Sequence, residues 1–212
     1  ICGLNLGHVG FLATIRNQNN FADDLARVMS CGYAETIERM MIRATVMRGK
    51  RKVYQAHALN DITIKSLTGI VNLSISTDGD CIRKIRGDGV IIATPTGATA
   101  YNLSAHGPIV MPDIKCFIIT ELMNHGVPIP SMVMKRNRVV TVTIDDFRET
   151  DLLLTRYSKE PVDVIATADY QSFVPLKKGD TIVVKRSERL IRFVELDKNY
   201  FFKSLAEKFN IR

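Results

Sequence analysis

Two short stretches of the sequence combine residue types that suit the binding of a nucleotide. Residues 87–101 read GDGVIIATPTGATAY, an acid between two glycines followed by an apolar run and by threonines around Pro95 and Gly97. The continuous apolar run at 90–93 predicts a strand buried on both faces. Pro95 ends that strand. A helix after it, capped by Thr96 or Thr99, would offer its first turn to an anion or a base edge, although an ordinary strand–loop–helix junction fits the same residues.

The second stretch is HALNDITI at 57–64, in which Asn60 and Asp61 interrupt β-branched sequence. Asn and Asp are disfavoured in strands, so the pair is either a bulge or turn, or a polar pair that points into a site. An amide beside a carboxylate suits ribose hydroxyls, as acidic residues do in dinucleotide sites. Asp88 fits a turn carboxylate or a ligand contact equally, and the preceding Arg86 is able to pair with it or with a phosphate. The histidines and serines show no spacing typical of a catalytic triad.

The remaining sequence predicts the elements that position these residues. Apolar residues at helical spacing predict helices from residue 21 to Gly32 and near the C-terminus, around Tyr200, Leu205 and Phe209. Short β-branched segments from residue 37 onward favour a sandwich or barrel rather than βαβ repeats. The charged stretch at 49–52 predicts an exposed hairpin tip, and a turn at 186–189 is expected to separate the last two strands.

Composition narrows the class of protein. The chain has 212 residues, 46% hydrophobic and 24% charged, which is normal for a globular protein and enough for a core without cross-links. No apolar run reaches the length of a membrane span, and no signal-peptide pattern opens the sequence. The net charge of +7 favours polyanionic ligands such as nucleotides, polyphosphate or nucleic acid, although a charged surface that only keeps the protein soluble fits it equally well. Four scattered cysteines predict no metal site, small buried thiols and a reducing, cytoplasmic compartment.

Four blocks of the sequence together resemble the NAD kinase family. In order they are GLNLGHVGFLA, ALNDITI, GDGVIIATPTGATAYNLSAHGPIVMP and YFFKSLAEKF. The resemblance implies a mainly β fold, with an NAD kinase-like C-terminal β-sandwich and part of an N-terminal α/β domain. It places remnants of that domain at 1–38, the NAD-binding sandwich at 39–175, and the last strands and a helix returning to the N-terminal domain at 176–212. The family's GGDG loop, which carries the catalytic aspartate, is expected shortly before Ile1, so no catalytic residue and no metal ligand is assigned in this chain.

The resemblance also implies the residues that bind NAD. The positions that match the family's site are Asn60, Asp61, Asp88, Thr99, Ala100, Tyr101, Ser104, Phe11, Arg86, Asp169 and Gln171. The sequence departs from the family pattern where Ala98 replaces a serine, where Tyr170 replaces a glycine between Asp169 and Gln171, and where residues 119–127 replace a proline-histidine-serine stretch in which His125 keeps the histidine. The implied reaction is phosphoryl transfer from ATP or polyphosphate, with Mg²⁺ or another divalent metal, to the adenosine 2′-hydroxyl of NAD, giving NADP.

The resemblance further implies a homodimer or homotetramer, with no nucleic-acid or membrane partner. Three other interpretations stay open at this point: an NAD(P)-binding module of the same fold without activity, a lipid or sphingoid kinase of related architecture, and a nucleic-acid binder. The Asn60–Asp61 pair and TPTGATAY argue against a lipid kinase. The sequence shows neither an RNA-stacking aromatic pattern nor a DNA-reading helix with clustered arginines.

Overall fold

The computed structural model describes residues 1–4, 10–13, 15, 18–31, 36–150, 162–197 and 199–210. The chain divides into two compact units, and each is described here by itself. The larger unit is Met40–Arg189, and the smaller unit combines Ile1–Arg39 with Leu190–Arg212. The expected domain boundaries at 38 and 175 stay a prediction.

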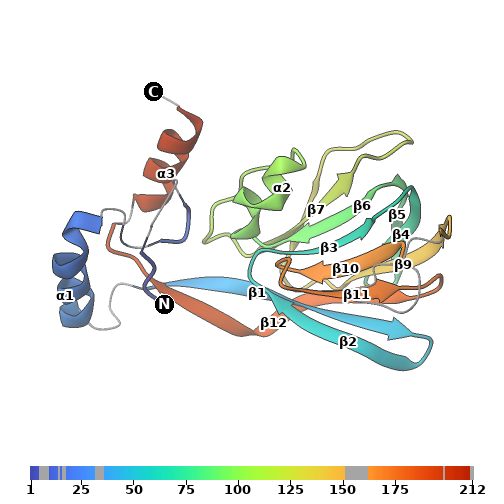
Figure 1. Ribbon diagram of the computed structural model, residues 1–212, viewed down its shortest axis with the longest axis horizontal. Helices are drawn as coiled ribbons and strands as arrows, with labels where there is room; N and C mark the ends of the chain where they lie inside the picture. The colour runs from blue at the N-terminus through green and yellow to red at the C-terminus, as the bar shows by residue number, and fades with distance from the viewer. Residues whose placement is uncertain are drawn as a thin grey trace. The chain divides into compact units, whose positions relative to one another are not determined.

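The larger unit is built from two six-stranded sheets, so the predicted mainly β fold is confirmed (Figure 1). The first sheet has the order β2 (Arg51–Ala58), β1 (Thr36–Arg48), β12 (Thr181–Val194), β9 (Val140–Phe147), β4 (Val71–Thr77) and β5 (Asp80–Gly87). The second sheet has the order β11 (Ser172–Leu176), β10 (Val164–Ala168), β3 (Asp61–Ser66), β6 (Gly89–Ala93), β7 (Cys116–Leu122) and β8 (Met132–Lys135).

The main core of this unit lies between the two sheets. Strands β4 and β9 alternate buried and partly exposed residues, the pattern of a sheet with one face against a core. Leu73 and Val142 from the first sheet join one apolar cluster with Ile92 and Phe117 from the second. The arrangement is therefore the predicted sandwich.

The second sheet is covered on its outer face as well. Ile91, Ala93 and Ile118 form a second apolar cluster, against which Tyr101 and Ala105 pack from the helical segment. This segment, residues 97–106, contains η3 (Gly97–Thr99), α2 (Tyr101–Ser104) and the turn that follows. Every residue of β6 is consequently buried, which confirms the strand predicted from the continuous apolar run.

The smaller unit contains η1 (Gln18–Asn20), α1 (Phe21–Cys31) and α3 (Tyr200–Phe209). The ring of Phe11 lies 5.5 Å from that of Phe201, which is buried on the inner side of α3. The Tyr200 hydroxyl donates a 2.7 Å hydrogen bond to the carbonyl of Gly10. Both predicted helices are therefore present, while Gly32, expected to end the first, lies outside the described residues.

Two sequence-based expectations about this fold are wrong. Strand β12 runs without a turn through 186–189, because Ser187 points inward and its buried hydroxyl makes a 2.8 Å hydrogen bond with Nδ1 of His57. Among the cysteines with described side chains, Cys116 is buried, but Cys2 and Cys81 are exposed. Cys81 lies near the start of β5, an edge strand, where residues 80–82 are all exposed.

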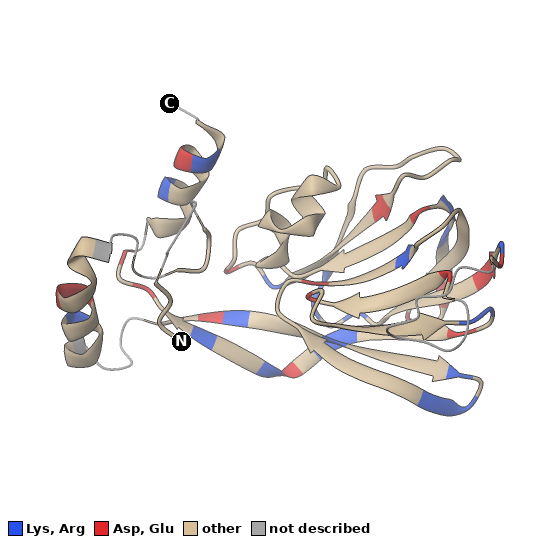
Figure 2. Cartoon of the chain, in the orientation of Figure 1, with Lys and Arg blue, Asp and Glu red and all other residues tan. Residues whose placement is uncertain are grey.

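The positive charge is not gathered on the helical segment. Arg51 and Lys52 are exposed at the tip of the β1–β2 hairpin, which confirms the predicted solvated tip (Figure 2). The segment Tyr101–Ser104 carries no charged residue. This segment, which forms part of the site described below, therefore contributes no positive charge to it.

Candidate functional site

The register of β3 and β6 brings the two sequence motifs together. These strands are antiparallel, and Asp61 at the start of β3 pairs with Ala93 at the end of β6. The backbone N–H of Thr94 donates a 2.8 Å hydrogen bond to the carbonyl of Asn60, and the Thr94 hydroxyl donates a 2.5 Å bond to the carbonyl of Leu59. The Thr-Pro-Thr-Gly bend and the Asn60–Asp61 pair are thus direct neighbours, as the sequence led us to expect.

Gly97 makes the closest approach between the two segments. A Cβ atom at this position would lie 2.0 Å from the carbonyl oxygen of Asn60 and would clash with it. Only glycine, which has no Cβ, avoids this clash. The Gly97 N–H donates a 3.1 Å hydrogen bond to the Thr94 hydroxyl. The expected helix cap by Thr96 is wrong, since the chain enters a 3₁₀ turn and Thr96 makes no side-chain cap. Thr99 instead donates its hydroxyl to the carbonyl of Thr96, at 3.4 Å.

Asp169 holds the backbone of the Asn60–Asp61 pair by hydrogen bonds. Its carboxylate accepts hydrogen bonds from the backbone N–H groups of Leu59, Asn60 and Asp61, at 2.7, 2.8 and 3.1 Å. Its own N–H donates to the carbonyl of Asp61, at 3.1 Å. With its carboxylate held by three backbone donors, Asp169 has the geometry of a positioning residue. Its expected contact with NAD stays a prediction.

The carboxyl group of Asp61 is buried and holds its proton unusually well. Its residue is 2% exposed, and its Oδ1 accepts a 2.8 Å hydrogen bond from the Thr63 hydroxyl. The pKa of Asp61 is raised from 3.8 to about 6, chiefly by burial and to a smaller extent by the neighbouring Asp169, while the Thr63 hydrogen bond opposes the rise. Raised carboxyl pKa values are typical of functional sites.

The side chains of Asn60 and Asp88 remain available to a ligand. Within the described ranges, neither the Asn60 amide nor the Asp88 carboxylate makes a hydrogen bond or ion pair. Asn60 is only partly buried, so water satisfies its amide in the free protein and a ligand group would take the place of that water. Asn60 therefore has the hydrogen-bonding capacity that a bound hydroxyl or base edge would satisfy.

Two tyrosines form an aromatic wall beside this pair. The rings of Tyr101 and Tyr170 meet edge to face with centroids 5.5 Å apart. The ammonium group of Lys65 lies 5.2 Å from the centre of the Tyr170 ring and 3.4 Å from its hydroxyl. Burial raises the pKa of the Tyr101 hydroxyl, and the neighbouring Tyr170 raises it further. The tyrosine that departs from the family pattern thus lies at the site.

A cavity of about 710 Å³ opens on the other side of Tyr101. Its lining includes Ser104 and His106 from the helical segment and Glu121, His125 and Ser131 from the β7–β8 region. The volume lies within the usual range of small-molecule sites, roughly 300–1,000 Å³. Tyr101 belongs to both the cavity lining and the aromatic wall, so the two adjoin at this residue, while Asn60 and Asp61 do not line the cavity.

Asn102 anchors the helical segment between the two parts of the site. Its amide donates to the carbonyls of Ala98 and Pro108, both at 3.2 Å, and accepts a 2.7 Å hydrogen bond from the Thr120 hydroxyl. Asn102 is completely buried. The sequence reasoning did not single it out, because an asparagine within YNLS gives no sign that one of its partners, Thr120, lies on strand β7.

The backbone around Gly87 and Asp88 contacts residues that line the cavity. The Asp88 N–H donates a 2.9 Å bond to the carbonyl of Leu122, and the His125 N–H donates a 2.8 Å bond to that of Arg86. A Cβ on Gly87 would lie 2.5 Å from the carbonyl oxygen of Met123, so the backbone at Gly87 is in close contact with the backbone at Met123. The side chains of Arg86 and Asp88 are exposed and no ion pair joins them, so the expected pairing is not formed.

Other expected site residues are placed less directly. Ala100 connects η3 to α2, and Gln171 is exposed in the β10–β11 turn, where its N–H donates to the carbonyl of Ala168. Phe11 belongs to the smaller unit. Among the described residues, no group of three or more His, Cys, Asp or Glu side chains has the geometry to hold a metal ion.

Comparison with known proteins identifies the class to which this fold and site belong. A family model described as the ATP-NAD kinase C-terminal domain matches residues 59–196. The NAD kinase of Geotalea daltonii is 33% identical over 210 residues, covering 98% of this chain and 69% of that protein. The NAD kinase of Lachnoclostridium phytofermentans is 35% identical over 214 residues, covering 99% of this chain and 71% of that protein. The chain belongs to the NAD kinase family.

Two solved structures share the fold. Yeast NADH kinase complexed with NADH superposes with a TM-score of 0.85 at 23% identity, covering 99% of this chain and 58% of the yeast chain. An NAD kinase from Archaeoglobus fulgidus in complex with ATP gives a TM-score of 0.77 at 24% identity, covering all of this chain and 74% of its own. Separately, none of the described helices is long and apolar enough to cross a membrane.

Proposed function

We propose that this chain binds NAD and contributes the acceptor site of an NAD kinase, an enzyme that transfers the γ-phosphate of ATP to the adenosine 2′-hydroxyl of NAD. One observation carries the proposal: the uncommitted Asn60 amide and the buried Asp61 carboxyl lie side by side, held by Thr94 and Asp169. An amide and a carboxylate in this arrangement suit the two hydroxyls of a ribose.

In this proposal each part of the site has a separate task. Asn60 and Asp61 orient the adenosine ribose, and Tyr101 and Tyr170 flank the bound dinucleotide. Asp88, Ser104 and the cavity receive its other end. An ionised Asp61 accepts hydrogen bonds from hydroxyls better than the protonated acid, so we expect NAD affinity to increase as the pH rises through about 6.

The phosphate donor is ATP, or polyphosphate in its place. Phosphoryl transfer depends on positioning the two substrates and on neutralising the negative charge of the phosphates. A divalent metal that bridges the phosphates supplies this neutralisation. The described residues present no cluster suited to a metal, and the 212 residues contain no GGDG sequence, so we assign to this chain neither the metal ligands nor the base that takes the hydroxyl proton. Its described residues bind and orient the acceptor.

The test is to measure binding and turnover separately. We expect calorimetry to show that the purified 212-residue chain binds NAD or NADP, and that Asn60→Ala weakens binding about tenfold by removing the uncommitted amide. Asn72→Ala, on the exposed side of β4, is the matched control and should bind as the parent does. Failure of the parent chain to bind either dinucleotide would contradict the proposal.

Turnover distinguishes the kinase from an inactive NAD(P)-binding module. We expect the 212-residue chain with ATP and Mg²⁺ to form NADP slowly or not at all, and the product of the complete gene to form it. Sequencing the gene upstream of Ile1 provides a quick check, since a GGDG there favours the kinase. A complete gene product that binds NAD but forms no NADP would favour the module.

A further inference from the structure

We infer that Arg83 is a positioning residue for the dinucleotide site, because it fixes the β7–β8 loop, residues 123–131, that forms one wall of the cavity. Arg83 is absent from the lining of that cavity, so it acts through the loop rather than by touching the ligand. The inference rests on the proposed function for its ligand, but the arrangement of the loop is tested independently below.

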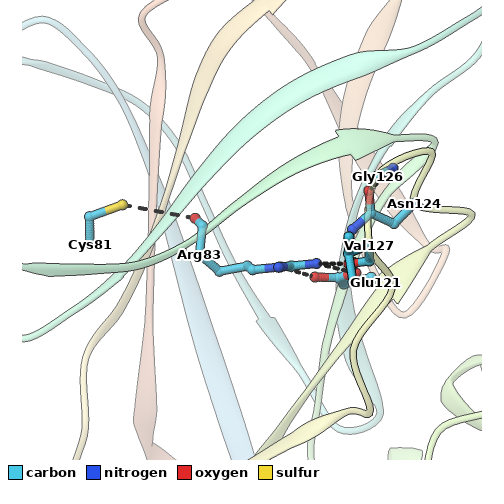
Figure 3. Close-up of polar contacts among 6 residues, drawn as sticks. All are labelled: Cys81, Arg83, Glu121, Asn124, Gly126 and Val127. Atoms are coloured by element: carbon cyan, nitrogen blue, oxygen red, sulfur yellow. Dashed lines mark hydrogen bonds and ion pairs between the residues drawn. The ribbon is translucent and has the colours of Figure 1, made fainter.

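Arg83 bridges the two sheets at their open edges. It lies on β5, the last strand of the first sheet, and reaches Glu121 on β7, the neighbour of edge strand β8 in the second sheet (Figure 3). Its Nε lies 2.5 Å from Oε1 of Glu121, and its NH2 group lies 3.3 Å from Oε2. The Glu121 side chain is 8% exposed and the Arg83 side chain 20%, so this two-point pair is largely removed from solvent.

The same guanidinium group also holds the centre of the loop. Its NH2 group donates a 2.5 Å hydrogen bond to the carbonyl of Val127. Arg83 thereby fixes one point before the loop, at Glu121, and one point within it, at Val127. A single planar side chain with several donors is suited to join two such points.

Glu121 extends this tie to the middle of the loop. Its Oε2 accepts a 2.6 Å hydrogen bond from the Asn124 amide, whose own oxygen accepts a 2.9 Å bond from the Gly126 N–H (Figure 3). The loop contains no regular strand or helix, and Met123 holds a positive φ of 42° that ordinary residues avoid. Side-chain ties therefore replace the backbone ladder that holds the adjoining strands.

The tied segment is also the one that contacts the Asp88 turn. Leu122 and His125 form backbone hydrogen bonds with Asp88 and Arg86, and the carbonyl of Met123 lies against Gly87. Release of the Arg83 contacts would allow both the cavity wall and Asp88 to shift. Asn60 and Asp61 would stay in place, since Thr94 and Asp169, which follow strands β6 and β10, hold them independently of Arg83.

The test compares Arg83→Met with a matched control. Arg83→Met keeps the apolar stem and removes the guanidinium group. Arg138→Met removes another arginine–carboxylate pair, 2.5 Å from Asp78, which is exposed at 54% and 38% and does not line the cavity. Arg83→Lys keeps the charge without the planar fork. Each variant of the 212-residue chain is titrated with NAD and with AMP well below its unfolding temperature, and amide hydrogen exchange is followed by mass spectrometry.

We expect Arg83→Met to bind NAD about tenfold more weakly, the loss typical of one charged hydrogen bond, with AMP affinity within about twofold of the parent. Exchange at 123–131 should become faster while exchange at 59–61 stays unchanged. For Arg83→Lys, the NAD affinity and the exchange rate at 123–131 should fall between those of the parent and Arg83→Met. Arg138→Met should match the parent in every measurement. A general loss of structure would weaken both ligands equally and would therefore contradict the inference.

Two further results would overturn it. Unchanged exchange at 123–131 in Arg83→Met would show that the loop does not depend on this arginine. Faster exchange with unchanged NAD affinity would show that the loop is tied but does not position the ligand. If the parent chain binds neither ligand, the proposed function fails, and the exchange measurement alone then decides whether Arg83 fixes the loop.

Discussion

The two sides of the candidate site are held by different kinds of interaction. The Asn60–Asp61 side lies at the ends of two central strands and is fixed mainly through backbone groups, by Thr94, Gly97 and Asp169. The cavity side is a loop at the edge of the sandwich, fixed by the side chains of Arg83 and Glu121. The contrast indicates a rigid surface that recognises the ribose and a more adaptable wall for the other end of the ligand.

Gly97→Ala should have the largest effect on the rigid side. The added Cβ would lie 2.0 Å from the carbonyl oxygen of Asn60, and the nearest atoms it would meet are all backbone atoms of Asn60, so no flexible side chain can move aside. We expect a loss of about 3 kcal/mol in unfolding free energy and no measurable NAD binding. Gly69→Ala, where nothing lies within 4 Å of the added atom, should change stability by about 0.5 kcal/mol or less in urea unfolding. Equal effects of the two substitutions would contradict the close approach.

Asp169→Asn should have the next largest effect. The carboxylate accepts hydrogen bonds from three backbone N–H groups through both of its oxygens. An amide has only one oxygen, so at least one of these three donors loses its partner. We expect about 2 kcal/mol of destabilisation and weaker binding of both NAD and AMP. Asp145→Asn, at an exposed carboxylate that bonds Ser74, should be nearly neutral. If Asp169→Asn impaired NAD binding without lowering stability, Asp169 would be a direct ligand contact instead.

Asp61→Asn should have a smaller effect, of opposite sign, on stability. Burial raises the pKa of Asp61 to about 6, so the folded protein holds this proton more tightly than the unfolded chain does. Stability should therefore fall as the pH rises from about 4 to 6, and the ionised group remains unfavourable above that range. We expect Asp61→Asn to flatten this decline and to add about 1–2 kcal/mol at pH 8, while weakening NAD binding. An unchanged pH profile of unfolding would refute the assignment.

The sequence predicted the rigid side better than the adaptable one, for a physical reason. The strand at 90–93, the bend after it and the Asn60–Asp61 pair are encoded by neighbouring residues, and the register of two strands joins them. The supports come from afar: Asp169 is more than a hundred positions from its backbone partners, and Arg83 is 38 from Glu121. Neither partnership leaves a local pattern in the sequence.

The errors have the same origin. The polar residues at 186–189 predicted a turn, yet Ser187 is buried against His57, a partner 130 positions away. Thr96 was expected to cap a helix, whereas Thr94, two residues earlier, makes the hydrogen bonds that shape the bend. In both cases the residue types were appropriate, but the tertiary partner decided which of them was used.

The most direct measurement is hydrogen exchange of the 212-residue chain with and without saturating NADP. The account predicts slower exchange in three segments, 59–61, 94–104 and 122–131, and no change in the β1–β2 hairpin. Protection restricted to other strands, or none at saturation, would contradict the claim that the Asn60–Asp61 pair, the Thr-Pro-Thr-Gly bend and the cavity form one dinucleotide site.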